Sequence, residues 1–470
     1  MTDLTKRSKQ ADSSTQAEWL SIDRFADETL RDGLARTLRE AILSGALRAG
    51  VRLPASRSLA IQLGVSRGVV SDAYAQLDAE GFLVSRTRAA PGVASVQAPT
   101  LPQAPPEIEV PLPRYDFNPT TPDVRLFPLT RWMAAAQRAA RHAGVAALDY
   151  RESRGERTLR AALADHLGRT RGVVADPAQI LIAQGTAQGV DLLLRVLRAR
   201  GATRVAVEDP SHTTQHERIK AMGLELIAQP VDGRGLIVDG LTADAVLVTP
   251  AHQFPTGCVL SGERRRLLIA WARANHGLII EDDYDSEFRY DREPVRALQG
   301  LAPGDVALLG TVSKTLAPAL RLGWIVVPAD LVDEAARMKR LLDDFSPALD
   351  QLTLAELLTR GEYDRHVSRA RSVYRSRRDR LLAALSASLP SLEPEGIAAG
   401  MHLVLRLPAG VDDVAVAAAA ADAAIRVPPL SQFRIAPATG GGLVIGYGRL
   451  HESAIDTATR ALAEAIRPHL

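Results

Sequence analysis

The sequence has almost no cysteine and no long hydrophobic run, and both absences exclude classes of protein. One cysteine, Cys258, in 470 residues excludes an intramolecular disulfide framework and fits a reducing compartment. No apolar run reaches the roughly 18 residues that a membrane-spanning helix requires. The polar N-terminus lacks the apolar segment of a signal peptide. We therefore expect a cytoplasmic protein with no membrane partner.

Proline marks a boundary between two domains of unequal size. A chain of 470 residues is too long for one ordinary hydrophobic core. Residues 91–114 contain seven prolines, and no helical period appears among them. This composition is typical of a semi-extended spacer. We expect a small domain over residues 20–90, a linker over 91–114 and a large domain over 115–470.

The small domain has the spacing of a winged helix–turn–helix. Apolar residues at helical spacing predict a first helix within residues 26–47. Ser56 and Ser66 are candidate N-caps of two further helices, and Gly64 fits the left-handed turn between them. Phe82-Leu-Val84 then predicts the first strand of a wing. The alternative is a small helical domain with a solvated arginine face.

Acidic residues are missing from the same region, although the net charge of the whole chain is only +2. From Ala41 to Ser71 there are four arginines and no Asp or Glu. The start of the second helix of the motif is where a recognition helix presents side chains to the major groove. Arginines nearby would hold phosphates, and one in the wing would reach a minor groove. The predicted DNA-binding residues are Arg52, Arg57, Ser66, Arg67 and Arg86.

In the large domain, strand-like and helix-like segments alternate, which favours a mostly parallel sheet covered on both faces. In such α/β sheets ligands bind at the carboxyl ends of the strands. The predicted strands are Ile180–Ala183, Arg204–Val207, Ala245–Thr249, Leu278–Glu281, Val306–Leu309 and Gly323–Val327.

Lys314 follows one of these strands within Gly310-Thr-Val-Ser-Lys-Thr. A lysine at a buried strand end is costly to keep charged, so its pKa should be lowered. A neutral amine can form a Schiff base with a carbonyl cofactor. Lys314 is therefore the candidate catalytic residue, and the alternative is a surface lysine after a strand.

Acidic residues end a second strand, at Glu281-Asp-Asp-Tyr-Asp285. A pyridine aldehyde cofactor needs a carboxylate facing its ring nitrogen, which Asp282 could supply, and Tyr284 could hold its 3-oxygen. Two residues apart on a strand, both side chains would face one ligand. The competing interpretation is a divalent-metal site with oxygen ligands.

Two further segments carry donors suited to a phosphate. Gly185, Thr186 and Ala187 open a predicted helix, and the N-terminus of a helix binds anions. Hydroxyl and guanidinium groups near Lys314 would add donors. A simple helix start is an equally good interpretation of the glycine turn alone. The predicted phosphate-binding residues are Gly185, Thr186, Ala187, Thr311, Ser313 and Arg321.

The motifs of the small domain resemble the GntR-type winged helix–turn–helix of bacterial regulators. They are Leu53-Pro-Ala-Ser-Arg-Ser-Leu-Ala60, Leu63-Gly-Val-Ser-Arg67 and Ala73-Tyr-Ala-Gln-Leu-Asp-Ala-Glu-Gly81. The wing departs from that family, because Arg86-Thr-Arg-Ala-Ala-Pro-Gly92 replaces its usual Gly-Ser-Gly-Thr turn. The wing contact is therefore less secure than the helical one.

The large domain resembles fold-type I aminotransferases, and the whole chain resembles the MocR/GabR regulators, which join the two domains by a long linker. The motifs that carry this resemblance are Thr249-Pro-Ala-His-Gln-Phe-Pro-Thr-Gly257, Ile280-Glu-Asp-Asp-Tyr-Asp-Ser-Glu-Phe-Arg-Tyr290 and Gly310-Thr-Val-Ser-Lys-Thr-Leu-Ala-Pro-Ala-Leu-Arg321. The resemblance implies a pyridoxal 5′-phosphate (PLP) cofactor on Lys314, with Asp282 at its ring nitrogen and Tyr284 at its 3-oxygen. It also places His212 where a tyrosine often stacks on the ring.

Two positions depart from the aminotransferase pattern. Phe254 replaces the asparagine that usually lies beside the 3-oxygen, and Val444 stands where an arginine usually binds the substrate α-carboxylate. Arg434 and Arg449 are possible substitutes. If no arginine pairs that carboxylate, ordinary α-amino acids should bind weakly, because an unpaired buried carboxylate is costly.

The resemblance implies a PLP-dependent transcriptional regulator that binds promoter DNA and responds to an amine effector or to PLP itself. It also implies a head-to-tail, domain-swapped homodimer. One alternative is an active aminotransferase with an accessory DNA-binding domain, and another is a regulator whose PLP site is vestigial.

Overall fold

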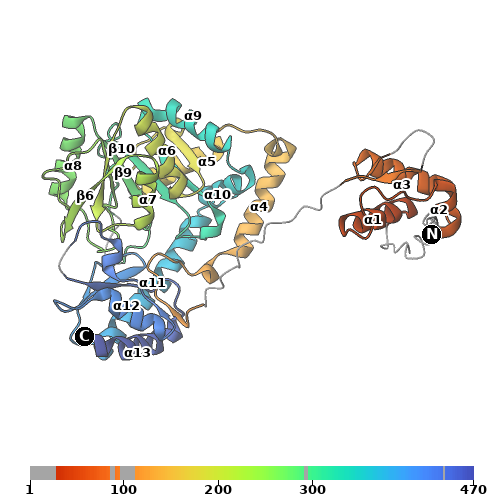
Figure 1. Ribbon diagram of the computed structural model, residues 1–470. Helices are drawn as coiled ribbons and strands as arrows, with labels where there is room; N and C mark the ends of the chain where they lie inside the picture. The colour runs from red at the N-terminus through yellow and green to blue at the C-terminus, as the bar shows by residue number, and fades with distance from the viewer. Residues whose placement is uncertain (1–27, 85–89, 96–111, 291–294, 438–439) are drawn as a thin grey trace, which may run out of the picture. The chain divides into compact units, whose positions relative to one another are not determined.

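A computed structural model describes residues 28–84, 90–95, 112–290, 295–437 and 440–470 (Figure 1). The chain forms two compact units, Met1–Glu109 and Val110–Leu470. Among the described residues, no helix has both the length and the hydropathy that crossing a membrane requires.

The described residues of the smaller unit, called the head below, form three helices and a two-stranded hairpin. Side chains at helical spacing form its core, with Leu34, Leu38, Leu59, Val70 and Leu77 at most 1% exposed. The two strands pair antiparallel, as expected for a wing. The elements are α1 (Leu30–Leu43), α2 (Ser56–Leu63), α3 (Arg67–Ala79), β1 (Leu83–Val84) and β2 (Gly92–Val93).

The caps between α2 and α3 are partly those that the sequence predicts. Gly64 has φ 64° and closes α2, and Ser66 Oγ accepts a hydrogen bond from the Val69 amide, which caps α3. The prediction of Ser56 as a cap is wrong. The first helical hydrogen bond is accepted by the Ala55 carbonyl, so Ser56 already lies inside α2 and its side chain caps nothing.

An eight-stranded sheet forms the centre of the larger unit, in the order β4-β11-β10-β9-β8-β5-β6-β7. The pairs from β10 to β6 are parallel, whereas β11 lies antiparallel between β10 and β4. The predicted mostly parallel α/β sheet is therefore confirmed. Its strands are β4 (Ile180–Ala183), β5 (Arg204–Asp209), β6 (Glu225–Asp232), β7 (Gly235–Leu236), β8 (Ala245–Val248), β9 (Leu278–Asp283), β10 (Val306–Thr311) and β11 (Gly323–Val326).

Helices cover both faces of this sheet, because each strand alternates its buried side chains between two cores. One core unites the strands with α6, α7 and α9, and the cores of the other face include α4, α5, α8 and α10 (Figure 1). These helices are α4 (Leu129–Ala143), α5 (Arg157–Arg171), α6 (Thr186–Ala199), α7 (Thr213–Ala221), α8 (Gly262–Asn275), α9 (Val332–Asp343) and α10 (Ala348–Thr359).

A C-terminal lobe packs its own core beside the sheet, and the first strand after the linker belongs to it. That strand, β3, pairs in parallel with β14, and the following Phe117 is fully buried in the core of the lobe. The elements of the lobe are β3 (Tyr115–Asp116), α11 (Glu362–Ser388), β12 (Pro394–Glu395), β13 (His402–Arg406), α12 (Asp413–Asp422), β14 (Ile425–Arg426), β15 (Gly442–Gly446) and α13 (Ile455–Ile466).

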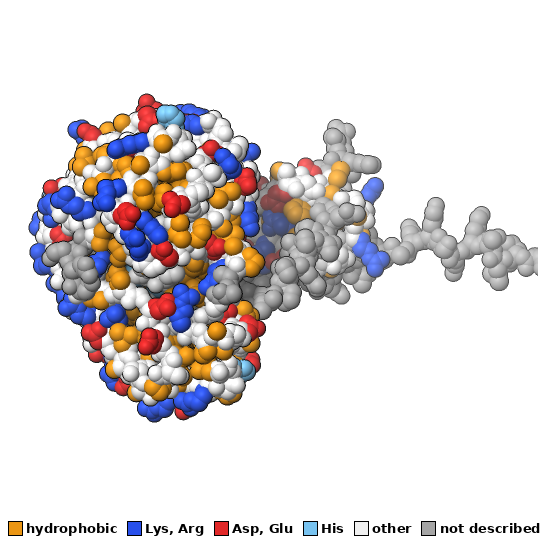
Figure 2. Space-filling view, turned by 90° about the vertical axis from the view of Figure 1, so that its left-hand side faces the viewer, with side chains coloured by type: hydrophobic (Ala, Val, Ile, Leu, Met, Phe, Trp, Pro, Cys, Tyr) orange, Lys and Arg blue, Asp and Glu red, His pale blue; other side chains and the backbone are white. Residues whose placement is uncertain are grey.

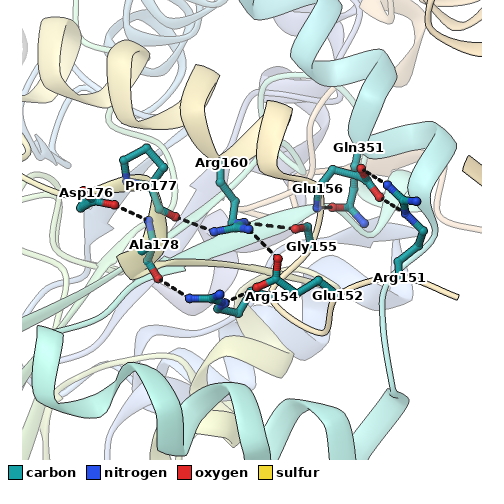
Figure 3. Close-up of polar contacts among 10 residues, drawn as sticks. All are labelled: Arg151, Glu152, Arg154, Gly155, Glu156, Arg160, Asp176, Pro177, Ala178 and Gln351. Atoms are coloured by element: carbon teal, nitrogen blue, oxygen red, sulfur yellow. Dashed lines mark hydrogen bonds and ion pairs between the residues drawn. The ribbon is translucent and has the colours of Figure 1, made fainter. Parts of the chain in front are cut away.

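The turn before α5 covers the edge of the sheet at β4, the strand that leads to the predicted anion site. The Arg154 carbonyl accepts a hydrogen bond from the Ile182 amide. Figure 3 shows how Arg160 of α5 holds this turn: its guanidinium donates to the carbonyl of Gly155 and pairs with Glu152. The edge strand is thereby paired and its end is fixed.

The surface of the larger unit carries charges of both signs. On the face seen in Figure 2, blue basic and red acidic side chains are interspersed among orange hydrophobic ones. This face has no field of a single sign that would attract nucleic acid.

Candidate functional site

Lys314 lies just beyond the carboxyl end of β10 and lines a cavity of about 140 Å³. Its Nζ donates to the carbonyl oxygen of Thr120, at 2.7 Å. Burial lowers the pKa of the amine, and the nearby carboxylates of Asp285 and Asp282 oppose that shift. The alternative of a surface lysine is therefore excluded.

Asp282 and Tyr284 line the same cavity as Lys314. Strands β9 and β10 are parallel neighbours in which Asp282 pairs with Leu309, so both strand ends open on one edge of the sheet. Burial raises the pKa of Asp282 to about 7, with Asp283 adding to the shift and Lys314 opposing it. Asp282 Oδ1 is buried and has no hydrogen-bond partner among the described residues.

Two other acids of the Glu281–Asp285 run, Glu281 and Asp283, turn away from Asp282. Glu281 accepts the backbone amides of Leu298 and Gln299, both at 3.0 Å, and Asp283 pairs with Arg171 at 2.8 Å. Alternate residues of a strand point to opposite faces, which separates these carboxylates from Asp282. The acidic run therefore does not converge on one point, as the divalent-metal interpretation required.

The residues of the predicted anion site meet where β4 ends and α6 begins. Gly185 has φ 84°, and a side chain there would meet the guanidinium of Arg321 at 3.1 Å. Arg321 donates to the carbonyl of Gln184, which fixes it beside the turn. Thr186 and Ala187, the first residues of α6, line the cavity. The start of α6 and the Arg321 guanidinium thus lie together, although Gly185 and Arg321 do not line the cavity themselves.

Glycines allow this close approach of strands and turn. A Cβ on Gly323 would lie 2.7 Å from the carbonyl oxygen of Gly310 and 2.9 Å from Gly185 Cα. A Cβ on Gly310 would collide with the ring of Trp324. At Gly323 the backbone of β11 therefore packs directly on the backbones of Gly310 and Gly185, and Gly310 leaves room for the Trp324 ring.

Thr311 and Ser313 lie together but do not line the cavity. Thr311 Oγ is 2.9 Å from Ser313 Oγ and 3.1 Å from the carbonyl oxygen of Leu322, and it accepts the Ser313 amide. These contacts order the loop that carries Lys314. Their predicted contact with a phosphate stays a prediction.

His212 caps α7 and lines the cavity. Its ring lies 5.3 Å from that of Phe254, centroid to centroid. Burial lowers the pKa of His212 to about 4, with the charge of Lys314 adding to the shift. The ring is therefore neutral at pH 7 and available for the stacking role that the resemblance implies.

Sequence reasoning missed several residues around the cavity. Thr120 acts through its backbone carbonyl, so no side-chain pattern could identify it. Glu208 lines the cavity, and burial raises its pKa to about 7. His252 Nδ1 lies 2.8 Å from Asp285 Oδ2 and 3.2 Å from the Tyr284 hydroxyl. Both His252 and Asp285 stand in motifs quoted above, which was a usable signal.

An apolar cluster surrounds Val444, the residue at which the resemblance expects a carboxylate-binding arginine. Val444 is fully buried and packs with Phe254 and Tyr284. Arg434 and Arg449 do not line the cavity: Arg434 donates to the carbonyl of Gly440 and Arg449 pairs with Asp116. The cluster consists of Phe254, Tyr284, Val404, Leu430, Phe433 and Val444.

In the head, four of the five predicted DNA-binding residues are exposed around α2 and α3: Arg52, Arg57, Ser66 and Arg67. Arg67 is the first residue of α3, and no acidic side chain lies in the first turn of that helix. Arg86 lies outside the described residues. The contacts of these side chains with DNA stay predictions.

The cavity fits the cofactor that the resemblance implies. The unpartnered, buried Asp282 Oδ1 would gain a partner in a protonated ring nitrogen. The lowered pKa of Lys314 favours the neutral, nucleophilic amine. The Gly185 turn and Arg321 would meet a phosphate.

Comparisons with known proteins agree with this geometry. A family model described as aminotransferase class I and II matches residues 118–458, and one described as bacterial regulatory proteins, gntR family, matches residues 30–93. The structure resembles that of an archaeal alanine:glyoxylate aminotransferase, with a TM-score of 0.71 and 26% identity over 77% of this chain and 92% of the other.

Two curated relatives extend over nearly the whole chain. The HTH-type pyridoxine biosynthesis transcriptional regulator PdxR of Corynebacterium glutamicum is 34% identical over 92% of this chain and 95% of its own. The probable rhizopine catabolism regulatory protein MocR of Rhizobium meliloti is 32% identical over 95% of both chains. The chain therefore belongs to the aminotransferase class I and II family and, with its gntR-family head, to the HTH transcriptional regulators of the MocR and PdxR type.

Proposed function

We propose that this protein is a PLP-dependent bacterial transcriptional regulator that binds promoter DNA through its head and senses PLP or an amine in the Lys314 cavity. The observation that carries the proposal is the shared cavity of Lys314 and the unpartnered Asp282 carboxylate, in a chain that also has a gntR-family head. PLP supplies an electron-withdrawing pyridine ring and an aldehyde that reacts with amines.

Different residues of the chain would bind different parts of PLP. Lys314 would bind the aldehyde carbon, and Asp282 would keep the ring nitrogen protonated. Tyr284 would hold the 3-oxygen, and His212 would stack on the ring. The phosphate would lie against Gly185, Thr186, Ala187, Thr311, Ser313 and Arg321.

PLP itself is the ligand that we favour as the signal. Val444 and its apolar neighbours leave an α-carboxylate without a buried cation, so an α-amino acid would lose affinity there. The relative from Corynebacterium glutamicum, which is 34% identical, is named for pyridoxine biosynthesis. A regulator that binds PLP would match transcription from its target promoter to the supply of that cofactor.

An active aminotransferase remains the second candidate, because Lys314, Asp282 and Tyr284 are all present in one cavity. The apolar cluster at Val444 weighs against it. Steady-state conversion of an amino donor and a 2-oxo acid would favour the enzyme, whereas binding or a single half-reaction would favour the regulator.

We further propose a cytoplasmic homodimer in which each head rests on the large unit of the partner. Exposed apolar side chains on α4, on the 3-10 turn Gly144–Leu148 and just after that turn support a subunit contact, because such side chains rarely gather on a monomer surface. They are Leu129, Met133, Val145, Leu148 and Tyr150, which are 58% to 87% exposed.

Borohydride trapping tests the central assignment. The wild-type protein incubated with PLP should gain one covalent adduct per chain, at Lys314, and its affinity for the DNA next to its own gene should change. Lys314→Ala should give no adduct, whereas Lys220→Ala, which removes an exposed lysine, should behave as the wild type. An adduct that persists in Lys314→Ala would refute the assignment.

A further inference from the structure

Residues 112–120, called the junction segment below, connect the linker to the ligand cavity. The segment lines a second, larger cavity of about 670 Å³ through Leu112, Pro113, Asn118, Pro119 and Thr120. The two cavities share Thr120, His212 and Phe254 in their walls, so they adjoin. A molecule in either cavity would therefore touch the segment that follows the linker.

The junction segment also supplies the partner of Lys314. The carbonyl oxygen of Thr120 accepts the hydrogen bond from Lys314 Nζ at 2.7 Å, and within the described residues this is the only hydrogen bond of that amine. A ligand that engages the amine withdraws this donor from the Thr120 carbonyl.

The rest of the junction segment is attached to the C-terminal lobe. The Arg114 amide donates to the carbonyl of Ala424, the Phe117 amide donates to that of Arg426, and the Phe117 carbonyl accepts the Gly446 amide. Asp116 pairs with Arg449 at 2.9 Å. The Lys314–Thr120 bond thus joins the sheet to a segment that otherwise belongs to the lobe.

We propose that the junction segment transmits the state of Lys314 to the linker: when a ligand engages the amine, Thr120 loses its bond to the sheet and the segment loosens. The proposal rests on the proposed function, because it takes PLP capture at Lys314 as the signal. The proposal assigns the coupling between Lys314 and the linker to backbone groups of the junction segment, which have no catalytic role.

Hydrogen exchange of the full chain, measured by mass spectrometry with and without PLP, tests the proposal. The amides of Arg114, Phe117 and Gly446 are hydrogen-bonded in the structure and should exchange slowly without ligand. With PLP, peptides that cover residues 112–121 should exchange at least about tenfold faster, because the opening free energy of a segment includes its tertiary bonds. Peptides from β9 and β10 should stay protected.

Two variants should release the segment without ligand. Lys314→Ala removes the donor, so exchange should be fast and indifferent to PLP. Gly446→Ala leaves Lys314 intact but places a Cβ against the carbonyl oxygen of Asn118 and 2.7 Å from Pro119 Cα, which must displace the segment. The matched controls are Lys220→Ala and Gly304→Ala, whose new Cβ meets nothing within 4 Å. Both should respond as the wild type.

The outcomes separate this proposal from the one on which it rests. Complete PLP adduct formation with unchanged exchange over residues 112–121 would overturn the coupling and leave the PLP site standing. Gly446→Ala that captures PLP and still shows the wild-type change in exchange would also overturn it. No PLP adduct in the wild type would overturn both proposals together.

Discussion

At the scale of single residues, the buried, unpartnered carboxylate of Asp282 destabilises the PLP-free protein, and the cofactor would remove this destabilisation. Asp282→Asn should stabilise the PLP-free protein at pH 8, and the gain should shrink toward pH 5. The pKa of Asp282 is about 7 in the folded protein against an ordinary 3.8, so the folded state binds the extra proton and stability falls as pH rises through this window. Asparagine cannot ionise and escapes that loss, which amounts to about 4 kcal/mol at pH 8.

Urea unfolding of PLP-free protein at pH 5, 6.5 and 8 measures this effect. Asp239→Asn, at an exposed position, is the control and should change little at any pH. The same variant of Asp282 should hold PLP more weakly, because an amide cannot keep the ring nitrogen protonated. A gain that is equal at all three pH values would contradict the pKa assignment.

The sequence identified site residues that act through their side chains more readily than residues that act through backbone groups. Lys314 and Asp282 were found because strand ends and residue chemistry identify them. Thr120 was not, because a carbonyl is present at every position and only the fold selects one. The contact between Asp285 and His252 joins residues that are 33 positions apart, and no local sequence pattern encodes it.

At the scale of elements, α3 should be the helix that recognises DNA. Arg67→Ala should weaken binding to the promoter by about 1–3 kcal/mol if the guanidinium contacts a base edge, with the salt dependence nearly unchanged. Arg57→Ala should instead reduce the salt slope by about one, as expected for a phosphate contact. Fluorescence anisotropy across a salt titration distinguishes the two.

Arg31→Ala is the control for both variants, because Arg31 lies on α1 and pairs with Asp32. It should leave affinity and slope unchanged. Equal affinity of Arg67→Ala and wild type at every salt concentration would contradict the assignment of α3.

Two glycines at or near the turn between α2 and α3 should respond to substitution by alanine with opposite changes in stability. Gly64→Ala should destabilise the head by about 1 kcal/mol, because φ 64° is strained for a residue with a Cβ. Gly68→Ala, inside α3, should stabilise it by up to about 1 kcal/mol, because alanine favours the helix. Native-state hydrogen exchange of α2 and α3 in the full chain measures both. Changes of the same sign would contradict the predicted backbone geometry.

Helices and strands could be predicted from the sequence where local residue chemistry determines their position. The apolar runs of β4, β5, β8, β9, β10 and β11 and the caps at Gly64 and Ser66 have local causes, and the structure contains them. Strands β6 and β7 were not predicted. The cap at Ser56 was wrong, since serine is as acceptable inside a first turn as before it. The antiparallel direction of β11 between β10 and β4 follows from tertiary packing and was not predicted.

At the scale of the whole molecule, two linked heads should bind DNA better than one. Residues 1–95 alone should bind the promoter more weakly than the full chain, because a dimer presents its second head at high effective concentration. Anisotropy with a full site and with a half-site measures the difference. Loss of the second half-site should weaken DNA binding by the full chain and leave the affinity of the separated head nearly unchanged. If the full chain and the separated head bind both DNA sites with equal affinity, dimeric binding is contradicted.

The glycine packing beside the anion turn has a consequence for how this protein can vary. Because a Cβ on Gly323 would meet the backbones of Gly310 and Gly185, a substitution at Gly323 cannot be offset by trimming a neighbouring side chain. A saturation library should therefore tolerate only the native residue there, and second-site suppressors should not arise. Evolution of a new ligand preference would have to proceed from the opposite wall, around Phe254 and Val444.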